Sequence, residues 1–239
     1  AAKEIERLLR FPSAMKVDSF SRGKLDLIRV KVPKESQLIG IPLHTFQKDT
    51  GLNVLITLIQ RGEDILIPNG FDALEADDLM SFIAAPKDVS KFFIKLGVDY
   101  TPVRDCIIVG GGRISYYIAR YIDEMHLNMR LKIIDSNKER CEYLADVLPD
   151  SIIINGDGID AELLKKEGIE NTDAFCSLTG FDEENIMLSL YAGKLSDARL
   201  ITKINRIAFE NVTNEMNLGS VIYPKQIVAE RILRYVRAL

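Results

Sequence analysis

Short apolar runs alternate with amphipathic stretches through the second half of the chain. The apolar runs are typical of strands buried on both faces of a sheet, and they fall at 105–110, 131–135, 151–155, 174–178, 200–205 and 221–223. Between and after them, the spacing of apolar residues predicts helices at 114–127, 137–147, 160–167, 183–195, 207–217 and 224–239. This alternation predicts a Rossmann-like doubly wound α/β domain, built on a parallel sheet, over residues 103–239.

The pattern is different between residues 24 and 98. Residues 24–32 alternate apolar and polar side chains, which is the period of a half-buried strand. Further strands are expected at 52–60, 64–68 and 77–84, and helices at 42–50 and 86–96. This mixture predicts a small α+β domain at 24–98, joined to the larger domain by the short segment VDYTP.

The chain begins with a predicted amphipathic helix, residues 1–11, which carries Ile5, Leu8 and Leu9 on one face and ends before a proline. Its last six residues, ERLLRF, are nearly repeated as ERILRY at 230–235, in the last predicted helix. Charged amphipathic helices draw on few residue types, so chance explains such a match as well as a duplicated unit does.

Composition and charge exclude several classes of protein. The net charge is −4, so no overall positive field favours nucleic acid or an anionic membrane. No run of apolar residues is long enough to span a bilayer. The first residues lack both an initiator Met and the apolar core of a signal peptide, as expected of a chain that starts within a longer protein.

The three cysteines, Cys106, Cys141 and Cys176, do not indicate a metal site. Their spacing fits no metal-ligand motif, and Cys106 and Cys176 lie inside apolar runs, where a free thiol behaves as a small apolar side chain. We therefore expect free thiols in the core, no metal site and a reducing, cytoplasmic location.

The segment CIIVGGGRIS, residues 106–115, is the richest in candidate chemistry. Gly110, Gly112 and Ser115 occupy the three positions of G-x-G-x-x-G, in which the first glycine makes the turn, the second admits a pyrophosphate and the third lets the helix pack on the sheet. Ser115 departs from the motif but is small, so we expect the packing to persist, slightly loosened. The motif follows a strand and opens a helix, whose N-terminus would lie beneath the phosphates. Arg113 either reaches the phosphates from this turn or is solvated.

Asp135 ends the second strand of the larger domain, 25 residues after Gly110. A carboxylate at this place accepts hydrogen bonds from both ribose hydroxyls of an adenosine and repels a 2′-phosphate. An Asp after a strand is also a common turn residue, but with the glycine turn in register we favour the ligand role. The pattern therefore predicts NAD(H), ADP or ATP as the ligand and disfavours NADP.

Two more loops follow strands at the same edge of the predicted sheet. Asp157 and Gly158 follow the third strand, and Thr179 and Gly180 follow the fourth. Open α/β sheets bind ligands outside the carboxyl ends of their strands, so both loops are expected to line the site. For Asp157 the alternative is a turn role, because it lies between two glycines.

The sequence offers no set of catalytic residues. It contains only two histidines, His44 in the small domain and His126, which lies about 18 Å along its predicted helix from the glycine turn. Neither a nucleophile elbow nor a Walker loop is present. We expect a nucleotide receptor and not an enzyme. The alternatives are a fragment of an NAD-dependent oxidoreductase, or a vestigial site in a domain that serves assembly alone.

Several motifs resemble those of known potassium-regulating domains. IIVGGGRIS, NGDGID and GIENTDAFCSLTGFDEEN resemble the RCK (KTN) nucleotide-binding domain, and VKVPKESQLIGIPL, ILIPNG and LEADDLMSFI resemble its companion, the TrkA-C domain. The resemblance covers the whole chain, and the order resembles regulators of Trk potassium uptake, which carry two tandem N-plus-C halves. It implies that residues 1–23 are the crossover helix and linker of a preceding nucleotide-binding domain, 24–98 the TrkA-C domain, and 103–239 the RCK N-domain with its own terminal crossover helix.

The resemblance also implies a function. It implies a nucleotide-binding regulatory subunit that gates a Trk-type membrane potassium transporter by changing conformation, with no role for nucleic acid. Such a subunit is cytoplasmic, reaches the inner face of the membrane only through its partner, and forms a homo-oligomer through its terminal helices. The family's nucleotide positions fall on Gly110, Gly111, Gly112, Arg113, Ile114, Asp135 and Asp157, with Thr179 and Gly180 less closely matched.

Overall fold

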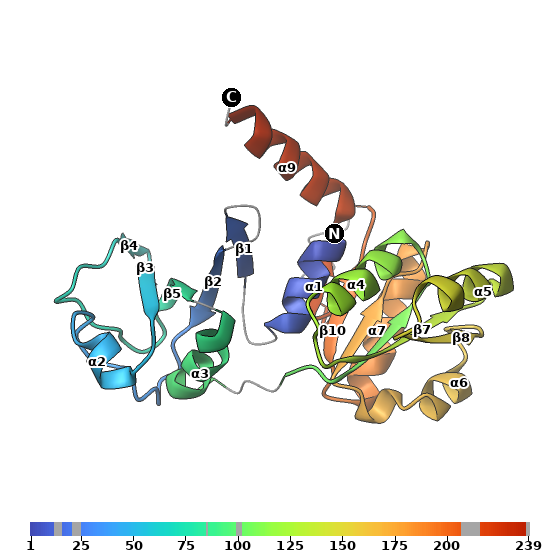
Figure 1. The fold of residues 1–239 in the computed structure, drawn as a ribbon, viewed down its shortest axis with the longest axis horizontal. Coiled ribbons are helices and arrows are strands. Elements are labelled where there is room, and N and C mark those ends of the chain that lie inside the picture. Colours follow the sequence, from blue (N-terminus) through green and yellow to red (C-terminus); the bar gives the residue numbers. More distant parts are fainter. Residues whose placement is uncertain (12–15, 21–24, 85, 99–101, 207–215, 238–239) are drawn as a thin grey trace. The chain divides into compact units, whose positions relative to one another are not determined.

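The computed structural model describes residues 1–11, 16–20, 25–84, 86–98, 102–206 and 216–237 (Figure 1). These residues form two compact units, each with its own apolar core. The larger unit comprises residues 1–9 and 103–239, and the smaller unit comprises residues 10–102.

Within the described residues, six parallel strands form the sheet of the larger unit. They are β6 (Asp105–Val109), β7 (Arg130–Asp135), β8 (Ile152–Asn155), β9 (Ala174–Ser177), β10 (Arg199–Lys203) and β11 (Ser220–Ile222). Their order in the sheet is β11-β10-β9-β6-β7-β8, so the chain proceeds outward from β6 in one direction and from β9 in the other. The reversal between β6 and β9 is the place where such sheets bind ligands.

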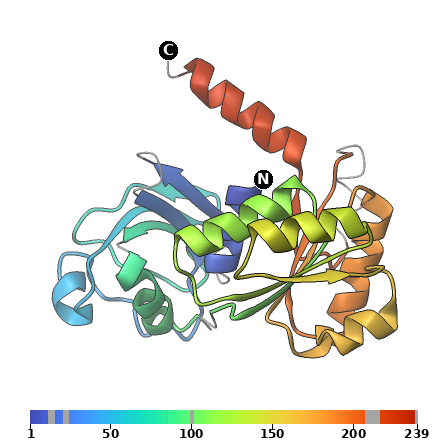
Figure 2. The same cartoon turned by 45° about the vertical axis from the view of Figure 1, so that its right-hand side comes forward.

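Helices cover both faces of this sheet (Figure 2). They are α1 (Ala2–Arg10), α4 (Arg113–Glu124), α5 (Lys138–Val147), α6 (Ala161–Lys166) and α7 (Asp182–Leu195), with a short 3₁₀ helix at Ile169–Asn171. The last helix, α9 (Pro224–Arg237), follows β11 and extends away from the sheet (Figure 1). One apolar cluster joins α1, α4 and α5 on the same face, through Ile5, Ile118 and Leu144. A second cluster, on the opposite face, contains Leu164 of α6 and Leu188 of α7. The unit is therefore doubly wound, as predicted.

The predicted elements of the larger domain are present within three residues of their expected bounds, where the structure describes them. The α4 helix ends earlier than expected because His126, just beyond it, has left-handed backbone angles (φ 51°). The helix expected at 207–217 falls mostly outside the described residues. Among the described helices, none has the length and apolar character needed to cross a membrane.

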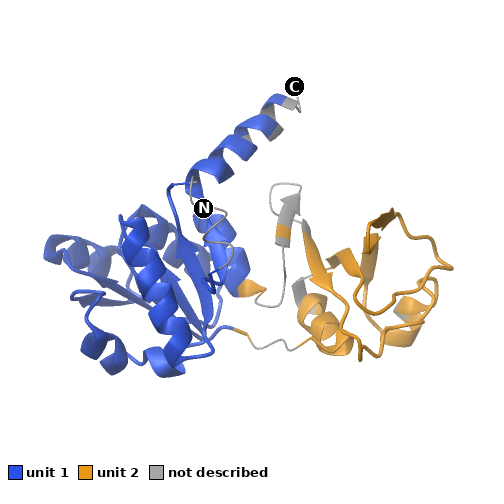
Figure 3. Cartoon of the chain, turned by 180° about the vertical axis from the view of Figure 1, so that it is seen from behind, with its two compact units in different colours: residues 1–9, 103–239 blue, residues 10–102 orange. Residues whose placement is uncertain are grey.

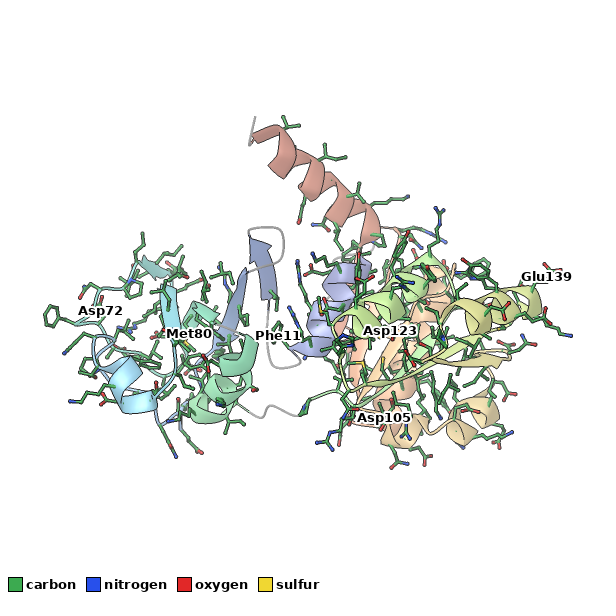
Figure 4. All side chains as sticks on the ribbon, in the orientation of Figure 1. Phe11, Asp72, Met80, Asp105, Asp123 and Glu139 are labelled. Carbon is green, nitrogen blue, oxygen red and sulfur yellow. The ribbon has the colours of Figure 1, made fainter. Side chains whose placement is uncertain are left out.

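The smaller unit combines an antiparallel sheet with two helices in the described residues (Figure 3). Its elements are β1 (Lys16–Phe20), β2 (Leu25–Lys31), α2 (Phe46–Thr50), β3 (Val54–Arg61), β4 (Asp64–Leu66), β5 (Leu79–Ala84) and α3 (Pro86–Leu96), and the strand order is β1-β2-β5-β3-β4. Met80 of β5, labelled in Figure 4, packs with Phe82 and with Phe92 and Phe93 of α3. These side chains form the core of the unit.

Two local features of the smaller unit differ from expectation. The β1 strand lies within residues 1–23, where we expected only a helix and a linker, and it pairs with β2 along its whole length. Its sequence, KVDSF, has too little apolar pattern to predict a strand, so the neighbouring strand determines its conformation. The α2 helix begins at Phe46 instead of near Pro42, because Pro42 bridges to Ala73 and its carbonyl accepts the Thr45 hydroxyl at 3.0 Å.

All three cysteines are free thiols and buried, as expected. The sulfur atoms of Cys106 and Cys176, on neighbouring strands β6 and β9, lie 3.9 Å apart. Contact with Cys176 and burial together raise the pKa of the Cys106 thiol. A thiol in this state stays protonated and unreactive, so these cysteines fill the core.

Candidate functional site

The glycine turn after β6 depends on glycine at its first two positions for steric reasons. Gly110 has φ +102°, and a Cβ there would lie 2.8 Å from the Leu178 carbonyl carbon and oxygen. A Cβ on Gly111 would lie 2.8 Å from a methyl carbon of Leu144 and 3.2 Å from the Asp135 side chain. The turn therefore packs closely between Asp135, at the end of β7, and Leu178, which follows β9.

Gly112 is different, because space surrounds it. It is the N-cap residue of α4, it is exposed, and a Cβ built on it meets no atom within 4 Å. The first turn of α4, with Arg113 exposed and Ile114 half-buried, contains no acidic residue. A helix N-terminus that is open and lacks negative charge is a favourable place for an anion.

Ser115, the departure from the glycine motif, is fully buried in the first turn of α4. Its hydroxyl donates a hydrogen bond to the Gly110 carbonyl. The serine therefore fits beneath the turn and adds a bond that a third glycine could not make.

Asp135 contacts the glycine turn directly. One carboxylate oxygen accepts the Gly111 N–H at 2.6 Å, and the other accepts the Asn137 N–H at 2.8 Å. The Gly111 carbonyl in turn accepts a hydrogen bond of 2.6 Å from Nε of Arg140, whose guanidinium lies 5.0 Å from the Tyr143 ring centroid. Both backbone polar groups of Gly111, its N–H and its carbonyl, are thus hydrogen-bonded to side chains. Sequence patterns did not single out Arg140, because its contact crosses a gap of 29 residues.

In the loop after β8, contacts within the protein account for both Asp157 and Gly158. The exposed carboxylate of Asp157 accepts the N–H of Ile159 at 3.0 Å and so closes a turn. A Cβ on Gly158 would lie 2.1 Å from a methyl carbon of Val109, so Gly158 is required for packing against β6. The turn alternative for Asp157 therefore agrees with its contacts.

The loop after β9 is fixed by Asn185, a residue that the sequence analysis did not single out. The side chain of Asn185, on α7, accepts the Thr179 N–H at 2.8 Å. Its amide nitrogen donates to the Lys203 carbonyl at 2.9 Å and to the Thr179 carbonyl at 3.3 Å. Gly180, the next residue, is exposed and has no atom near its Cβ position. Thr179 and Gly180 therefore lie at the same edge as the glycine turn.

Lys203, at the end of β10, brings a positive charge to this edge and was not predicted. Its ammonium donates to the Leu178 carbonyl at 3.3 Å, and that carbonyl is the group against which a Cβ on Gly110 would lie. Burial lowers the pKa of Lys203, although Asp182 opposes the effect. In the part of the chain that the structure describes, Lys203 forms no ion pair. An anion bound at the turn would compensate this half-buried charge.

A cavity of about 210 Å³ lies at the opposite, amino edge of the sheet. Its lining includes Asp105, labelled in Figure 4, and four of its charged side chains form two ion pairs: Arg130 with Asp105, and Lys132 with Glu167 at 3.1 Å. We do not assign the site to this cavity, because sheets of this kind bind ligands at the carboxyl ends of their strands. In the described ranges, no group of His, Cys, Asp and Glu side chains is arranged to hold a metal ion.

Both units match known domain families. Residues 106–224 match the family model described as the TrkA-N domain, and residues 27–97 match that of the TrkA-C domain. The chain belongs to the TrkA family.

Curated relatives of this TrkA-family chain are named for potassium uptake. The Trk system potassium uptake protein TrkA of Halomonas elongata is 32% identical over 98% of this chain and 50% of that protein. The protein of the same name from Haemophilus influenzae is 30% identical over 98% of this chain and 51% of that protein. The chain therefore spans about half the length of the curated relatives it matches.

Solved structures share the fold of this TrkA-family chain. The GsuK RCK domain aligns with a TM-score of 0.61 and 17% identity, over 97% of this chain and 50% of that chain. The GsuK channel bound to NAD aligns with a TM-score of 0.59 and 19% identity, over 97% of this chain and 41% of that chain. At these identities the likeness concerns the fold.

The edge of the TrkA-N domain fits an adenine nucleotide on its own geometry. The open N-terminus of α4 and the Lys203 ammonium suit phosphates. Asp135 accepts two backbone N–H groups, and a carboxylate has about four lone-pair positions, so acceptor capacity remains for ribose hydroxyls.

Proposed function

We propose that this chain is a nucleotide-binding regulatory part of a potassium uptake transporter. NAD(H) or ADP/ATP binds at the carboxyl edge of β6, β7 and β9 and shifts the balance between two conformations, which changes ion flux through a Trk-type membrane partner. The observation that carries this proposal is the position of Gly111 beside an open helix N-terminus. Asp135 accepts its N–H, and Arg140 donates to its carbonyl. The names of the curated relatives, which refer to potassium uptake by the Trk system, support it.

Each part of the nucleotide has a place in this proposal. The Gly110 and Gly111 N–H groups are bonded to Ile134 and Asp135 and shape the turn, and the N–H groups from Gly112 to Ile114 receive the phosphates, with Arg113 at the exposed rim. Asp135 receives the ribose hydroxyls. The loop of Thr179 and Gly180 lines the far side of the phosphates, and Asp157 and Gly158 shape the neighbouring loop. NAD is the first ligand to test, because a solved channel of the same fold carries it.

Regulation is favoured over hydride transfer by the placement of the acid–base groups. His44 belongs to the smaller unit, where Nδ1 lies 2.8 Å from the Gly70 carbonyl. His126 lies beyond the end of α4 that is remote from the glycine turn. The proposed function therefore includes no chemical step. The NAD-dependent oxidoreductase remains the alternative, and the experiments below separate the two.

The terminal helices support an assembly role. In α1, Leu8 and Leu9 are 6% and 1% exposed in the apolar core of the larger unit. Their counterparts in the repeat on α9, Ile232 and Leu233, are 57% and 53% exposed. We infer that α9 binds another nucleotide-binding domain in the way that α1 binds this one. Residues 1–23 then act as crossover segment, 24–98 as the TrkA-C domain and 103–239 as the RCK N-domain of a homo-oligomer at the cytoplasmic face of the membrane.

Calorimetric titration of NADH, NAD, ADP and ATP tests the proposed site. We expect micromolar binding of at least one of them, and a loss of about tenfold or more in Asp135→Ala, because the ribose loses its acceptor. Asp146→Ala is the matched control, since Asp146 is an exposed residue of α5. If no adenine nucleotide binds, or if Asp135→Ala binds as the unchanged protein does, the proposed site is wrong.

The regulatory role is tested with the membrane partner present. Nucleotide added to the full-length protein and its transporter in vesicles should change potassium flux, and the nucleotide should be recovered unchanged. Consumption of NADH in a screen of carbonyl substrates, followed at its nicotinamide absorbance band, would instead support the oxidoreductase.

A further inference from the structure

Asn185 is a fully buried polar residue in the first turn of α7. Every hydrogen-bonding group of its side chain is directed at two loops of the ligand edge. The carbonyl oxygen takes the Thr179 N–H, and the two amide hydrogens go to the carbonyls of Thr179 and Lys203. A side chain that satisfies three backbone groups in the interior fixes their positions, because leaving any of them unpaired costs free energy.

The same helical turn also fixes the chain beyond β10. Asp182, 5% exposed, accepts the N–H groups of Asn205 and Arg206 at 2.8 and 3.0 Å. Asp182 is the first residue of α7, and the N-cap position before it, Phe181, makes no side-chain cap. The side chains of Asp182 and Asn185 in the first turn of α7 therefore hold two loops and do not cap their own helix.

These loops lie on one side of the glycine turn. In the sheet, β7 and Asp135 lie on one side of β6, and β9 and β10 lie on the other. Leu178, which precedes the loop held by Asn185, has its carbonyl against Gly110 and bonded to Lys203. A nucleotide with its ribose on Asp135 and its first phosphate on the turn therefore extends its remaining part over β9 and β10.

We propose that Asn185 is a positioning residue for the part of the nucleotide that lies beyond its first phosphate. Asn185 holds the Thr179 loop and the Lys203 backbone in the positions from which they contact the distal part of the nucleotide. It makes no contact with the adenosine. This inference rests on the proposed function, because it concerns the same site. It predicts that Asn185 affects ligands according to how far they extend past the turn.

Ser189 provides a matched control on the same helix. It is also fully buried, and its hydroxyl contacts Ser177 at 2.7 Å and Thr202 at 2.6 Å. Those partners are strand residues of β9 and β10, and neither is a group that Asn185 bonds. Removing the Ser189 hydroxyl therefore disturbs the packing of α7 to a similar degree without releasing the Thr179 loop.

The experiment compares AMP, ADP and NADH in calorimetric titrations of the unchanged chain, Asn185→Ala and Ser189→Ala, with thermal unfolding of each. We expect Asn185→Ala to weaken ADP and NADH about tenfold or more and AMP less than about twofold, since it removes the three hydrogen bonds that position the Thr179 loop and the Lys203 backbone. Ser189→Ala should change no affinity by more than about twofold, although it lowers the unfolding temperature. Equal weakening of all three ligands by Asn185→Ala, or the same selectivity in Ser189→Ala, would overturn the inference.

Asn185→Asp keeps the proposal testable if the alanine variant does not fold. It has nearly the same shape and retains the acceptor for the Thr179 N–H, but it removes both donors to the carbonyls. The same selective loss of ADP and NADH is expected. If neither variant folds, Asn185 is required for the fold itself and its positioning role is rejected. If the unchanged chain binds none of the three ligands, the proposed function fails first, which is a distinguishable result.

Discussion

Gly110 and Gly112 belong to the same turn, but a side chain would be unfavourable at each for a different physical reason. At Gly110 the backbone is left-handed and the Leu178 carbonyl occupies the place of a side chain. At Gly112 the backbone is extended, with φ −68° and ψ −173°, and the Cβ position is open. The fold therefore requires the first glycine, whereas the second leaves open space beside the N-terminus of α4, where we propose that the phosphates bind.

Alanine substitutions separate these two reasons. Gly110→Ala should lower the free energy of unfolding by about 2–4 kcal/mol, because strain and a steric clash add together. Gly112→Ala should change it by less than about 0.5 kcal/mol, yet weaken nucleotide binding at least about tenfold, because the new methyl group enters the space for phosphate. Urea unfolding followed by circular dichroism measures the first effect, and calorimetry measures the second. Normal nucleotide binding by Gly112→Ala would place the phosphates elsewhere.

At the scale of residues, the sequence predicts what a motif encodes. The glycines and Asp135 were found because their spacing belongs to a recurrent turn and strand end. Arg140, Asn185 and Lys203 were not found, because each reaches the site through a side chain or carbonyl that meets its partner only after folding. Nothing in their local sequence distinguishes them from an exposed or helix-capping residue.

At the scale of elements, α1 and α9 carry nearly the same six residues in opposite environments. Leu9 of α1 is buried in the apolar core of the larger unit, whereas its counterpart Leu233 on α9 is half exposed. Val228 and Val236 extend the exposed stripe along α9. The covered apolar face of α1 and the exposed apolar stripe of α9 are what the proposed contact between α9 and another domain would explain.

Matched substitutions in the two helices test this contact. Leu9→Ala should destabilise the larger unit by about 3 kcal/mol, as loss of a fully buried leucine does. Leu233→Ala should leave its unfolding unchanged but weaken self-association, because the leucine lies in the proposed interface. Urea unfolding measures stability, and sedimentation velocity at several concentrations measures association. A destabilised Leu233→Ala monomer, or association equal to that of the unchanged chain, would contradict the proposed role of α9.

Helices and strands were predicted correctly where their own pattern of apolar and polar residues determines their conformation. Helices cover both faces of the larger sheet, so the middle of β6, β7 and β9 is mostly apolar, and polar residues mark where these strands end. The β1 strand has no such pattern, and its pairing with β2 supplies what the five residues lack. The start of α2 was misplaced for a related reason, since the bridge between Pro42 and Ala73 joins residues far apart in the chain.

At the scale of the whole molecule, two units with separate cores lie along one chain, and the proposed nucleotide site is made by the larger unit alone. A ligand that binds only the folded form of one unit stabilises that unit, by about 2.7 kcal/mol at one hundred times its dissociation constant. Scanning calorimetry should therefore show the transition of the larger unit move to higher temperature with ADP or NADH, while the transition of the smaller unit stays in place. Asp135→Ala at the same ligand concentration is the control and should show a smaller shift. If nucleotide moves both transitions together, the units unfold as one, and the smaller unit already responds to the nucleotide in this chain. If it moves only the first, the nucleotide acts on the larger unit alone, and the proposed regulation would require the contact that we propose for α9.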